Sequence, residues 1–374
     1  MNFKFKFSDY TSFFKHPAMG ISIHNWVLLL NKHRFNIYIG FIPKASLITF
    51  FALFNSPFHL FEYLRFSSRI KKVKIKTPVF VLGHPRSGTT YLNNILSKDP
   101  VFSYSATYDV LTPHIFLTFK KGLKLMMSKA MPSTRPQDNM KLSINSPNEE
   151  EFAMANISQT SYMHGFFFPK DILQNFKESV VFNDTKFSNH WKKRYDFFLK
   201  KLAYKYTAQQ LLLKSPANTG RLKEIAELYP DAKFIHIYRN PYDVYLSTER
   251  LYEKVLPITS FQQVDNKKME TYIIEAYALL YKKYLLDKKQ LPKEQLFEIK
   301  YEDFVKNPVE TIEKAYHQLG LKTFKEAEQL FKNEVNAEKD YVKNSYATVP
   351  PSIKKIINEK WKFAFDEFGY PIEN

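Results

Sequence analysis

The chain alternates short apolar runs with segments in which apolar residues recur at helical spacing. The runs predict buried strands at Thr77–Gly83, Leu211–Leu213, Lys233–Tyr238 and Leu296–Lys300. Helical spacing follows the first two of these runs, in Leu92–Leu96 and in Leu222–Tyr229. Two further helices should begin at Asn240-Pro241 and Asn307-Pro308, because asparagine caps helices and proline is favoured at the first helical position. Gly320 should end the second of them.

Strands that alternate with helices predict an α/β fold in which helices flank a central parallel sheet. No repeat or low-complexity linker divides the sequence, so we expect a single domain over residues 1–374. Residues 1–76 form an apolar helical extension in this interpretation, 78–320 the core, and 321–374 C-terminal helices. The stretch from Val101 to Tyr206 shows less regular periodicity, and we expect it to carry binding loops.

The segment from Phe35 to Leu64 is crowded with aromatic and aliphatic residues. Its longest uninterrupted apolar stretch, Ala45–Phe54, is shorter than the roughly 20 residues that span a bilayer. We expect a helix buried against the domain. The alternative is an interfacial helix that lays the protein on a membrane surface.

Composition narrows the function classes. The 374 residues include no cysteine, which excludes disulfides, thiolate catalysis and cysteine-ligated metals. Met1–Tyr10 lacks the apolar run of a signal peptide, so we expect a cytoplasmic protein. The net charge of +18 suits an anionic nucleotide, a nucleic acid or an anionic membrane, although a lysine-rich solvated surface explains it equally well. Aromatic and basic residues do not interleave as a nucleic-acid groove requires, so no nucleic-acid partner is expected.

The most specific motif is Gly83-His84-Pro85-Arg86-Ser87-Gly88-Thr89-Thr90, between a predicted strand and a predicted helix. Glycines let backbone N–H groups converge on an anion at a helix N-terminus. Arg86, Ser87, Thr89 and Thr90 can add side-chain donors. A kinase or NTPase loop carries lysine after the second glycine, where this chain has Thr89, which argues against a P-loop kinase and its magnesium.

At this loop the chain resembles the sulfotransferases that use 3′-phosphoadenosine-5′-phosphosulfate (PAPS), whose loop reads P-[KR]-S-G-T-T and matches Pro85 to Thr90. Leu213-Lys214-Ser215-Pro216 resembles the family's lysine-bearing strand end, and Tyr301-Glu302-Asp303 resembles its adenine-contacting motif. Arg239 followed by Ser247 resembles its clamp on the 3′-phosphate. The resemblance implies a three-layer P-loop-type fold, PAPS as co-substrate, adenosine 3′,5′-bisphosphate (PAP) as product, and no metal.

The chemistry of these residues also suits a phosphate clamp. Arg239 ends a strand, and its planar fork of donors suits a phosphate, with Ser247 about two turns into the next helix. A surface ion pair with Asp243 is the alternative for Arg239. Without the motif context, Ser247 would be interpreted as an ordinary helix residue and Tyr301 as a core residue.

Within the family, the chain looks nearest to bacterial members that act on lipid-like alcohols such as sterols or quinone derivatives. The residues that carry this likeness are the apolar N-terminal region, Thr107-Tyr108-Asp109 with Pro113-His114, Arg135-Pro136-Gln137-Asp138-Asn139, and Ser146-Pro147-Asn148-Glu149-Glu150-Glu151-Phe152-Ala153. The Phe- and Met-rich variable region predicts an apolar acceptor pocket. We expect a lipid-like alcohol, a sterol first, with phenols and carbohydrates as alternatives.

Sulfuryl transfer is expected to proceed in line, so positioning and electrostatics dominate catalysis. Arg86 and Lys214 are the candidates for stabilising the leaving-group oxygen. Cytosolic sulfotransferases place a histidine base two residues after this lysine, where the chain has Pro216, so a carboxylate is expected instead.

The candidate bases are Asp109, Glu150 and Glu151, with His114 and His164 in reserve. The alternative for the three glutamates from residue 149 is a solvated acidic helix start. The family's C-terminal R-K-G motif is missing, and Lys343, Lys354 or Lys355 would have to replace it. The remaining alternative to an enzyme is a basic membrane-surface protein without catalysis.

Overall fold

The computed structural model describes residues 5–6, 9–10, 16–131, 134, 142–207, 210–338 and 348–373. The chain forms two compact units, each assembled from three segments. Unit 1 comprises Met1–Lys74, Ser105–Ala208 and Leu251–Tyr272, and unit 2 comprises Ile75–Tyr104, Gln209–Arg250 and Ile273–Asn374. The organisation as a single domain remains a prediction.

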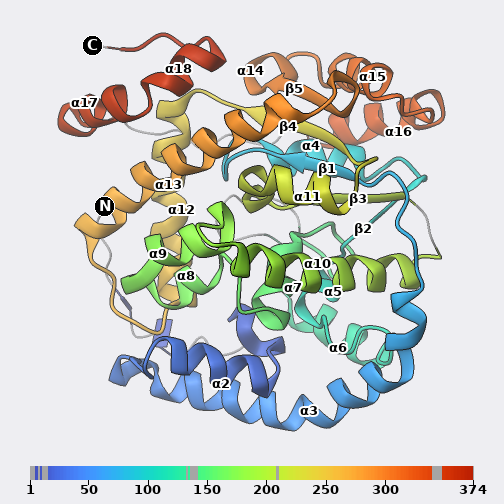
Figure 1. The fold of residues 1–374 in the computed structure, drawn as a ribbon, viewed down its shortest axis with the longest axis vertical. Coiled ribbons are helices and arrows are strands. Elements are labelled where there is room, and N and C mark those ends of the chain that lie inside the picture. The colour runs from blue at the N-terminus through green and yellow to red at the C-terminus, as the bar shows by residue number, and fades with distance from the viewer. Residues whose placement is uncertain are drawn as a thin grey trace. The chain divides into compact units, whose positions relative to one another are not determined.

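Unit 2 contains a sheet of five parallel strands in the order β2-β3-β1-β4-β5 (Figure 1). Its strands are β1 (Val79–Leu82), β2 (Phe102–Tyr104), β3 (Gln210–Lys214), β4 (Lys233–Tyr238) and β5 (Leu296–Lys300). The predicted α/β fold with a central parallel sheet is confirmed. The sequence missed β2, because three residues are too few to show a periodicity.

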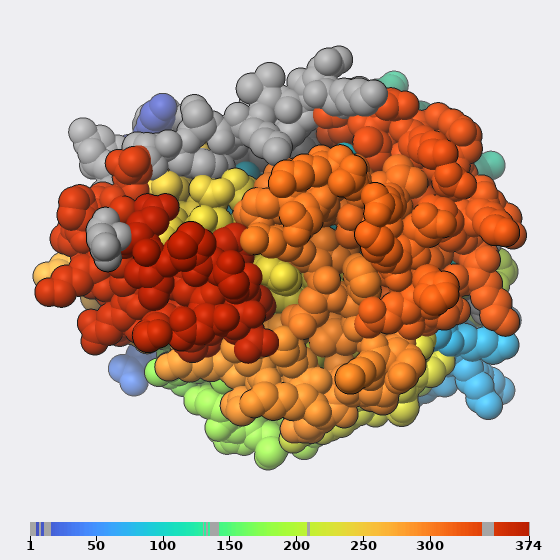
Figure 2. All heavy atoms as spheres, turned by 90° about the horizontal axis from the view of Figure 1, so that it is seen from above, coloured from blue at the N-terminus to red at the C-terminus, as the bar shows by residue number. Residues whose placement is uncertain are grey.

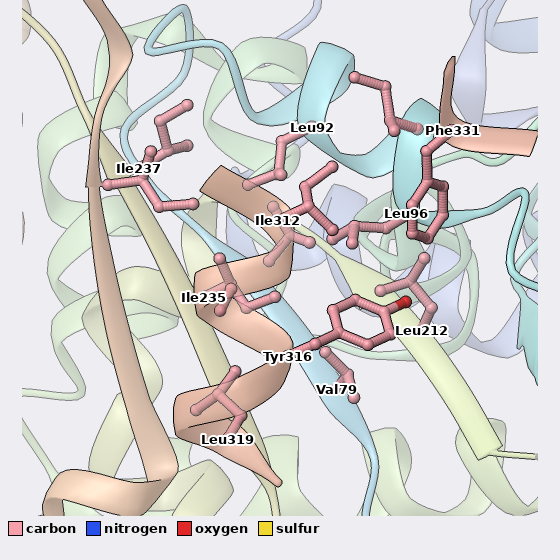
Figure 3. Packing of buried hydrophobic residues seen from close by; sticks show 14 of the residues in the cluster. Val79, Leu92, Leu96, Leu212, Ile235, Ile237, Ile312, Tyr316, Leu319 and Phe331 are labelled. Atoms are coloured by element: carbon pink, nitrogen blue, oxygen red, sulfur yellow. The ribbon is translucent and has the colours of Figure 1, made fainter. Parts of the chain in front are cut away.

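Side chains that alternate along the strands fill a core on each face of this sheet. On one face, Val79, Val81, Ile235 and Ile237 pack with α4 (Thr89–Leu96), α15 (Pro308–Leu319) and α16 (Phe324–Ala337). Figure 3 shows Val79, Ile235 and Ile237 in this core. On the other face, the rings of Phe80 and Phe234 lie 5.6 Å apart, and Tyr229 covers Phe80. Both faces are therefore buried, as a parallel sheet between two helical layers requires.

The other elements of unit 2 are short helices around the sheet. They are η6 (Pro216–Arg221), α11 (Leu222–Leu228), η7 (Lys288–Gln290), η8 (Lys293–Gln295), α14 (Tyr301–Phe304), α17 (Pro351–Lys360) and α18 (Lys362–Phe368). Helices α12 (Pro241–Thr259) and α13 (Asn266–Asp287) have residues in both units. Figure 2 shows the face on which the residues from β5 onward, in orange and red, form most of the surface.

The predicted helix boundaries in unit 2 are confirmed at the residue level. Asn240 caps α12, because its Oδ1 accepts a hydrogen bond from the Tyr242 amide at 2.9 Å. Helix α15 begins at Pro308 and ends at Leu319, and its C-cap Gly320 has a φ of 68°, the left-handed conformation that favours glycine. Asn307 precedes α15 but makes no side-chain cap.

Unit 1 is helical. Its elements are η2 (Pro17–Gly20), α2 (Ile23–Lys32), η3 (Ile39–Phe41), α3 (Ile42–Lys71), α5 (Thr107–Leu111), α6 (Gly122–Ala130), α7 (Glu150–Ile157), α8 (His164–Phe167), η4 (Pro169–Asp171), α9 (Ile172–Phe176), the π-helical turn η5 (Lys177–Val181) and α10 (Thr185–Lys205). The segment from Val101 to Tyr206 is thus more regular than predicted. Its longest helix, α10, buries Trp191, Tyr195, Phe198 and Leu202, whose helical spacing is visible in the sequence.

The apolar segment around residues 35–64 forms α3, which continues to Lys71. One side of α3 is buried through Ala45, Ile48 and Ala52, as the prediction of a packed helix requires. Among the described residues, the stretch Ile39–Lys71 is the one helix long and apolar enough to cross a membrane. This test counts the whole helix, with its interrupting polar residues, whereas the sequence prediction counted only the uninterrupted stretch Ala45–Phe54.

Buried neutral histidines make the fold sensitive to acid. Burial lowers the pKa of His16 to about 3 and the pKa values of His84 and His164 to about 4, and each ring contacts a backbone carbonyl. At pH 7 these rings are neutral in the folded chain and largely neutral in the unfolded chain, so they add little pH dependence there. As the pH falls below about 6.5, the unfolded chain takes up protons that the folded chain does not.

Lowering the pH from 7 to 5 should therefore reduce the free energy of unfolding by about 2 kcal/mol for each of the three histidines. Urea denaturation at the two pH values measures the change, and His164→Gln should reduce it by about 2 kcal/mol. A free energy of unfolding that stays constant between pH 7 and pH 5 would contradict the expectation.

Candidate functional site

The loop from Gly83 to Thr90 joins β1 to α4 in unit 2, as predicted, and internal hydrogen bonds fix it. The Gly83 amide donates to Thr219 Oγ1 at 2.7 Å. The Ser87 hydroxyl donates to the carbonyl oxygens of His84 (2.8 Å) and Ile237 (3.0 Å). Ser87 was predicted to contact the nucleotide with its side chain, whereas these bonds tie its hydroxyl to β4 and to the loop itself. Its contribution to an anion site would come from the backbone.

The backbone of this loop has a positive φ at three positions, with 148° at Gly83, 75° at Arg86 and 100° at Gly88. A positive φ is unfavourable for arginine, and such strain is found mostly where a loop must hold a functional geometry. Gly88 is the N-cap of α4, so the amides of Thr89 and Thr90 begin the helix and have no acceptor within it. The loop therefore directs N–H groups and the positive end of a helix dipole to one place.

The structure brings the predicted nucleotide-binding residues of unit 2 together. Arg86 Nε donates to Ser247 Oγ, on α12, at 2.9 Å. The Arg239 guanidinium, at the end of β4, lies 4.6 Å from the ring centre of Tyr301 on α14. A Cβ atom added to Gly88 would lie 2.5 Å from the Tyr301 ring, so Tyr301 connects the loop to the clamp. The motifs, separated by up to about 215 residues of sequence, thus surround the N-terminus of one helix.

Arg239 forms the ion pair that the sequence offered as an alternative. Its Nη2 lies 2.9 Å from Asp243 Oδ2, one helical turn into α12. The Asp243 side chain is 45% exposed, so water screens this pair and the net gain is small. A phosphate could replace the carboxylate, because both present oxygens to the same guanidinium fork. The ion pair and the phosphate clamp are therefore compatible roles of Arg239.

Replacement of Gly88 by alanine should damage the loop in two ways. The added Cβ would collide with Tyr301, and alanine would be strained at φ 100°. We expect Gly88→Ala to weaken binding of PAP at least about 10-fold and to lower stability by about 1–2 kcal/mol. Calorimetry and thermal unfolding measure the two effects. Gly122→Ala is the control, since a Cβ there meets nothing within 4 Å. Unchanged nucleotide affinity in Gly88→Ala would contradict the role of the loop.

Lys214 occupies the end of β3, opposite Val81 of β1 in the sheet register. Lys214 is only 3% exposed, whereas a lysine at an ordinary strand end would be exposed to solvent. Since parallel strands end at the same edge of a sheet, Lys214 lies at the edge from which the Gly83–Thr90 loop emerges. Thr89 is buried, while Pro85 and Thr90 are partly exposed. This placement suits the predicted contact with a leaving group.

The carboxylate candidates belong to unit 1. Asp109, on α5, is completely buried, and both of its oxygens have partners. Oδ1 pairs with Lys205 Nζ at 2.5 Å, while Oδ2 accepts from Tyr206 Oη at 2.9 Å and from the Ala106 amide at 3.2 Å. These contacts cap α5 and join it to the end of α10. They describe a structural role for Asp109.

Glu150 and Glu151 lie in the first turn of α7, which begins after Glu149. They are 0% and 1% exposed, so the alternative of a solvated acidic helix start is wrong for these two. Glu150 accepts from the hydroxyls of Ser105 (3.1 Å) and Tyr195 (3.3 Å). Glu151 Oε1 accepts from the Ser161 hydroxyl at 2.8 Å and from the Tyr162 amide at 2.7 Å. Two adjacent buried carboxylates are costly and often mark a functional site.

The reserve histidines contact backbone carbonyls. His114 Nε2 lies 3.2 Å from the Asn156 oxygen, and burial holds its pKa well below the usual value. His164 Nε2 lies 2.9 Å from the Ala155 oxygen, and burial lowers its pKa to about 4. A ring nitrogen that donates to a carbonyl cannot accept a proton, so only Nδ1 of each ring could act as a base.

Several residues that the sequence analysis did not select support the loop and the clamp. Thr219 accepts from Gly83, and Tyr281 Oη accepts from the His84 amide at 3.3 Å. Glu302 accepts from Tyr370 Oη at 2.6 Å and from the Asn240 amide at 3.3 Å, beside Arg239. Only Glu302 carried a sequence signal, since it follows Tyr301 in the family motif.

The residues expected to complete the 3′-phosphate site are only partly described. Lys354 Nζ pairs with Glu373 at 3.0 Å and lies over the Tyr242 ring. Lys355 is exposed on α17. Lys343 lies outside the described residues, as does the motif Arg135 to Asn139. Among the side chains that the structure describes, no three His, Asp or Glu residues gather as a metal site.

Comparisons with known proteins agree on one family. A family model described as "Sulfotransferase family" matches residues 78–326. Omega-hydroxy-beta-dihydromenaquinone-9 sulfotransferase Stf3 of Mycobacterium bovis is 29% identical over 360 residues, which cover 94% of this chain and 90% of Stf3. The protein of the same name from Mycobacterium tuberculosis matches equally well.

Two solved structures share the fold. Sulfotransferase STF1 from Mycobacterium tuberculosis H37Rv is similar with a TM-score of 0.67 at 15% identity, covering 92% of this chain and 93% of STF1. Sulfotransferase STF9 from Mycobacterium avium is similar with a TM-score of 0.65 at 17% identity, covering 84% of this chain and 83% of STF9. The fold expected from the motifs is therefore confirmed.

Proposed function

The chain belongs to the sulfotransferase family, and from that premise we propose that it transfers the sulfuryl group of PAPS to the hydroxyl of a lipid-like acceptor. PAPS is the proposed donor because Arg86, Ser247, Arg239 and Tyr301 lie together around the N-terminus of α4. Two guanidinium groups and a helix N-terminus suit a donor that carries anionic groups at both ends of a nucleoside. Thr89 stands where a kinase would have its lysine.

Each residue of the site has a proposed role. The amides at the start of α4, together with Arg86, hold the 5′-phosphosulfate, while Arg239 and Ser247 hold the 3′-phosphate and Tyr301 contacts the adenine. Lys214 and Arg86 stabilise the negative charge that develops on the leaving oxygen. PAPS supplies the activated sulfuryl group, and the protein supplies position and charge.

We assign the general base to Glu151. The contacts of Asp109 and Glu150 join separate elements of unit 1, which is a structural task. Glu151 contacts the turn that begins the aromatic segment after α7, where the rings of Tyr162 and Phe166 lie 4.9 Å apart. An apolar acceptor can pack against such rings, and a carboxylate beside it can accept the proton of the acceptor hydroxyl.

The name of the relative Stf3 supports an acceptor of the hydroxylated menaquinone type, since the match covers nearly the whole of both chains. We therefore propose an apolar alcohol with an isoprenoid or quinone portion, and a sterol as the second choice. The sequence predicted the stretch from Val101 to Tyr206 as the acceptor region, and residues 105–206 of it fall in unit 1. We further propose a cytoplasmic enzyme that associates peripherally with a membrane through residues 35–64.

The test is incubation of the purified chain with labelled PAPS and a panel of hydroxylated quinones, sterols, phenols, sugars and a lipid extract, read by mass spectrometry. We expect a sulfated product from an apolar alcohol, together with PAP. Calorimetry should show binding of PAP without Mg²⁺. Binding of ATP with Mg²⁺ but not of PAP would instead indicate a kinase or NTPase, and sulfation of a sugar alone would overturn the proposed acceptor class.

A further inference from the structure

Helix α3 is apolar on its solvent-exposed side as well as along most of its buried side. The side chains that it turns toward unit 1 include the charged Lys44 and Glu62, which are 0% and 1% exposed. Its opposite side, here named the outer face of α3, consists of Phe50, Leu53, Phe54, Phe58, Phe61 and Leu64. The spacing of three and four residues places these six side chains in one stripe along the helix.

The outer face of α3 is exposed to solvent to an extent that is unusual for large apolar residues. Its members are between 36% and 70% exposed, and three of its rings form a row through Phe50, Phe54 and Phe58. Scattered exposed apolar residues are normal, but a continuous stripe marks a surface that something else covers.

Polar anchors hold α3 on unit 1 and argue against a transmembrane position. Lys44 Nζ donates to the Ile258 carbonyl oxygen at 3.0 Å, and Glu62 pairs with the buried Lys201 at 2.5 Å. The Trp26 indole of α2 donates to Thr49 at 2.8 Å between these anchors. Withdrawal of α3 into hydrocarbon would leave a lysine and a glutamate without these partners, which is very costly. The helix can therefore lie along a bilayer but not cross it.

The positive charge around α3 indicates that its outer face would contact an anionic surface. Residues 10–74 contain nine lysines and arginines and a single carboxylate side chain, Glu62, which is buried. Arg65, Arg69 and Lys71 are exposed at the C-terminal end of the outer face. Basic side chains beside an inserted apolar face are attracted to anionic head groups.

We propose that the outer face of α3 inserts into the surface of an anionic phospholipid bilayer, with the helix lying in the plane of the membrane (Figure 1). A second copy of the chain is a poorer occupant, because a symmetric contact would place two basic rims together without counter-charge. This inference deepens the peripheral association proposed above and rests on it. It gives an apolar acceptor a route from the bilayer to unit 1.

Vesicle flotation tests the inference with the full chain and without any acceptor. Vesicles of phosphatidylcholine with phosphatidylglycerol at about 7:3 should carry the protein, and phosphatidylcholine vesicles should carry much less. The double variant Leu53→Glu with Phe61→Glu should lower the partition constant at least about 30-fold. Leu286→Glu is the matched control, since Leu286 is 64% exposed on α13 and lies outside the outer face.

Three results would overturn the inference: no flotation of the unmodified chain, equal flotation of the double variant, or a dimer in sedimentation velocity that the double variant abolishes. Calorimetry with PAP on the same samples tests nucleotide binding independently of membrane binding. A double variant that binds PAP normally but fails to float supports the membrane surface and leaves the donor assignment intact. A chain that floats but does not bind PAP retains the membrane surface and loses the proposed function.

Discussion

Replacement of Arg239 by alanine should weaken binding of PAP about 100-fold, because charge-assisted hydrogen bonds to the 3′-phosphate would be lost. The guanidinium is held in place before any nucleotide arrives, by the ring of Tyr301 and by the Asp243 carboxylate. Such preorganisation reduces the entropy lost on binding, so the truncation should be costly. Isothermal titration calorimetry with PAP at fixed ionic strength measures the effect.

Replacement of Asp243, the ion-pair partner of Arg239, is a control that should not weaken the binding of PAP. In Asp243→Ala the arginine remains but loses its competing carboxylate, so PAP should bind as tightly as before or severalfold more tightly. Tyr301→Leu should lie between the two, since it removes the ring but not the charge. If Arg239→Ala and Asp243→Ala both left the affinity unchanged, Arg239 would be only a surface ion pair and the 3′-phosphate site would have to lie elsewhere.

The sequence predicted the strands and helices that carry the loop and the proposed clamp well, because each one depends on local chemistry. Lys233–Tyr238 and Leu296–Lys300 have the predicted bounds, and Asn240 caps its helix as expected. In these segments the residue types, the strand ends and the helix caps all favour the same structure. The motif order then predicted which ends of strands and helices would meet, and the contacts of Arg86 with Ser247 and of Arg239 with Tyr301 agree.

The environment of the acidic motif could not be predicted in the same way. Three consecutive glutamates ordinarily indicate a solvated helix start. The burial of Glu150 depends on Ser105 and Tyr195, each 45 residues away in sequence. Similarly, the orientation of α3 follows from its long-range partners Ile258 and Lys201 and not from its own composition. Tertiary contacts of this kind leave no periodic signal.

Replacement of Glu151 by glutamine should lower kcat by about 100- to 10,000-fold, the contribution typical of a general base, while PAP still binds normally. Glutamine retains the shape of the side chain and an oxygen that can accept from Ser161 and from the Tyr162 amide, so the fold should persist. Steady-state sulfation at saturating PAPS, measured with the acceptor found in the panel, gives kcat apart from nucleotide affinity. Glu150→Gln is the adjacent control and should change kcat much less.

Asp109→Asn separates a structural carboxylate from a catalytic one. This variant breaks the ion pair with the largely buried Lys205 and disturbs the cap of α5, so it should lower the free energy of unfolding by about 2–4 kcal/mol. At a temperature where it remains folded, its kcat should stay within about threefold of the unmodified enzyme. The reverse pattern, with Asp109→Asn stable but inactive and Glu151→Gln fully active, would transfer the role of base to Asp109. Full activity in all three variants would mean that none of these carboxylates takes the proton.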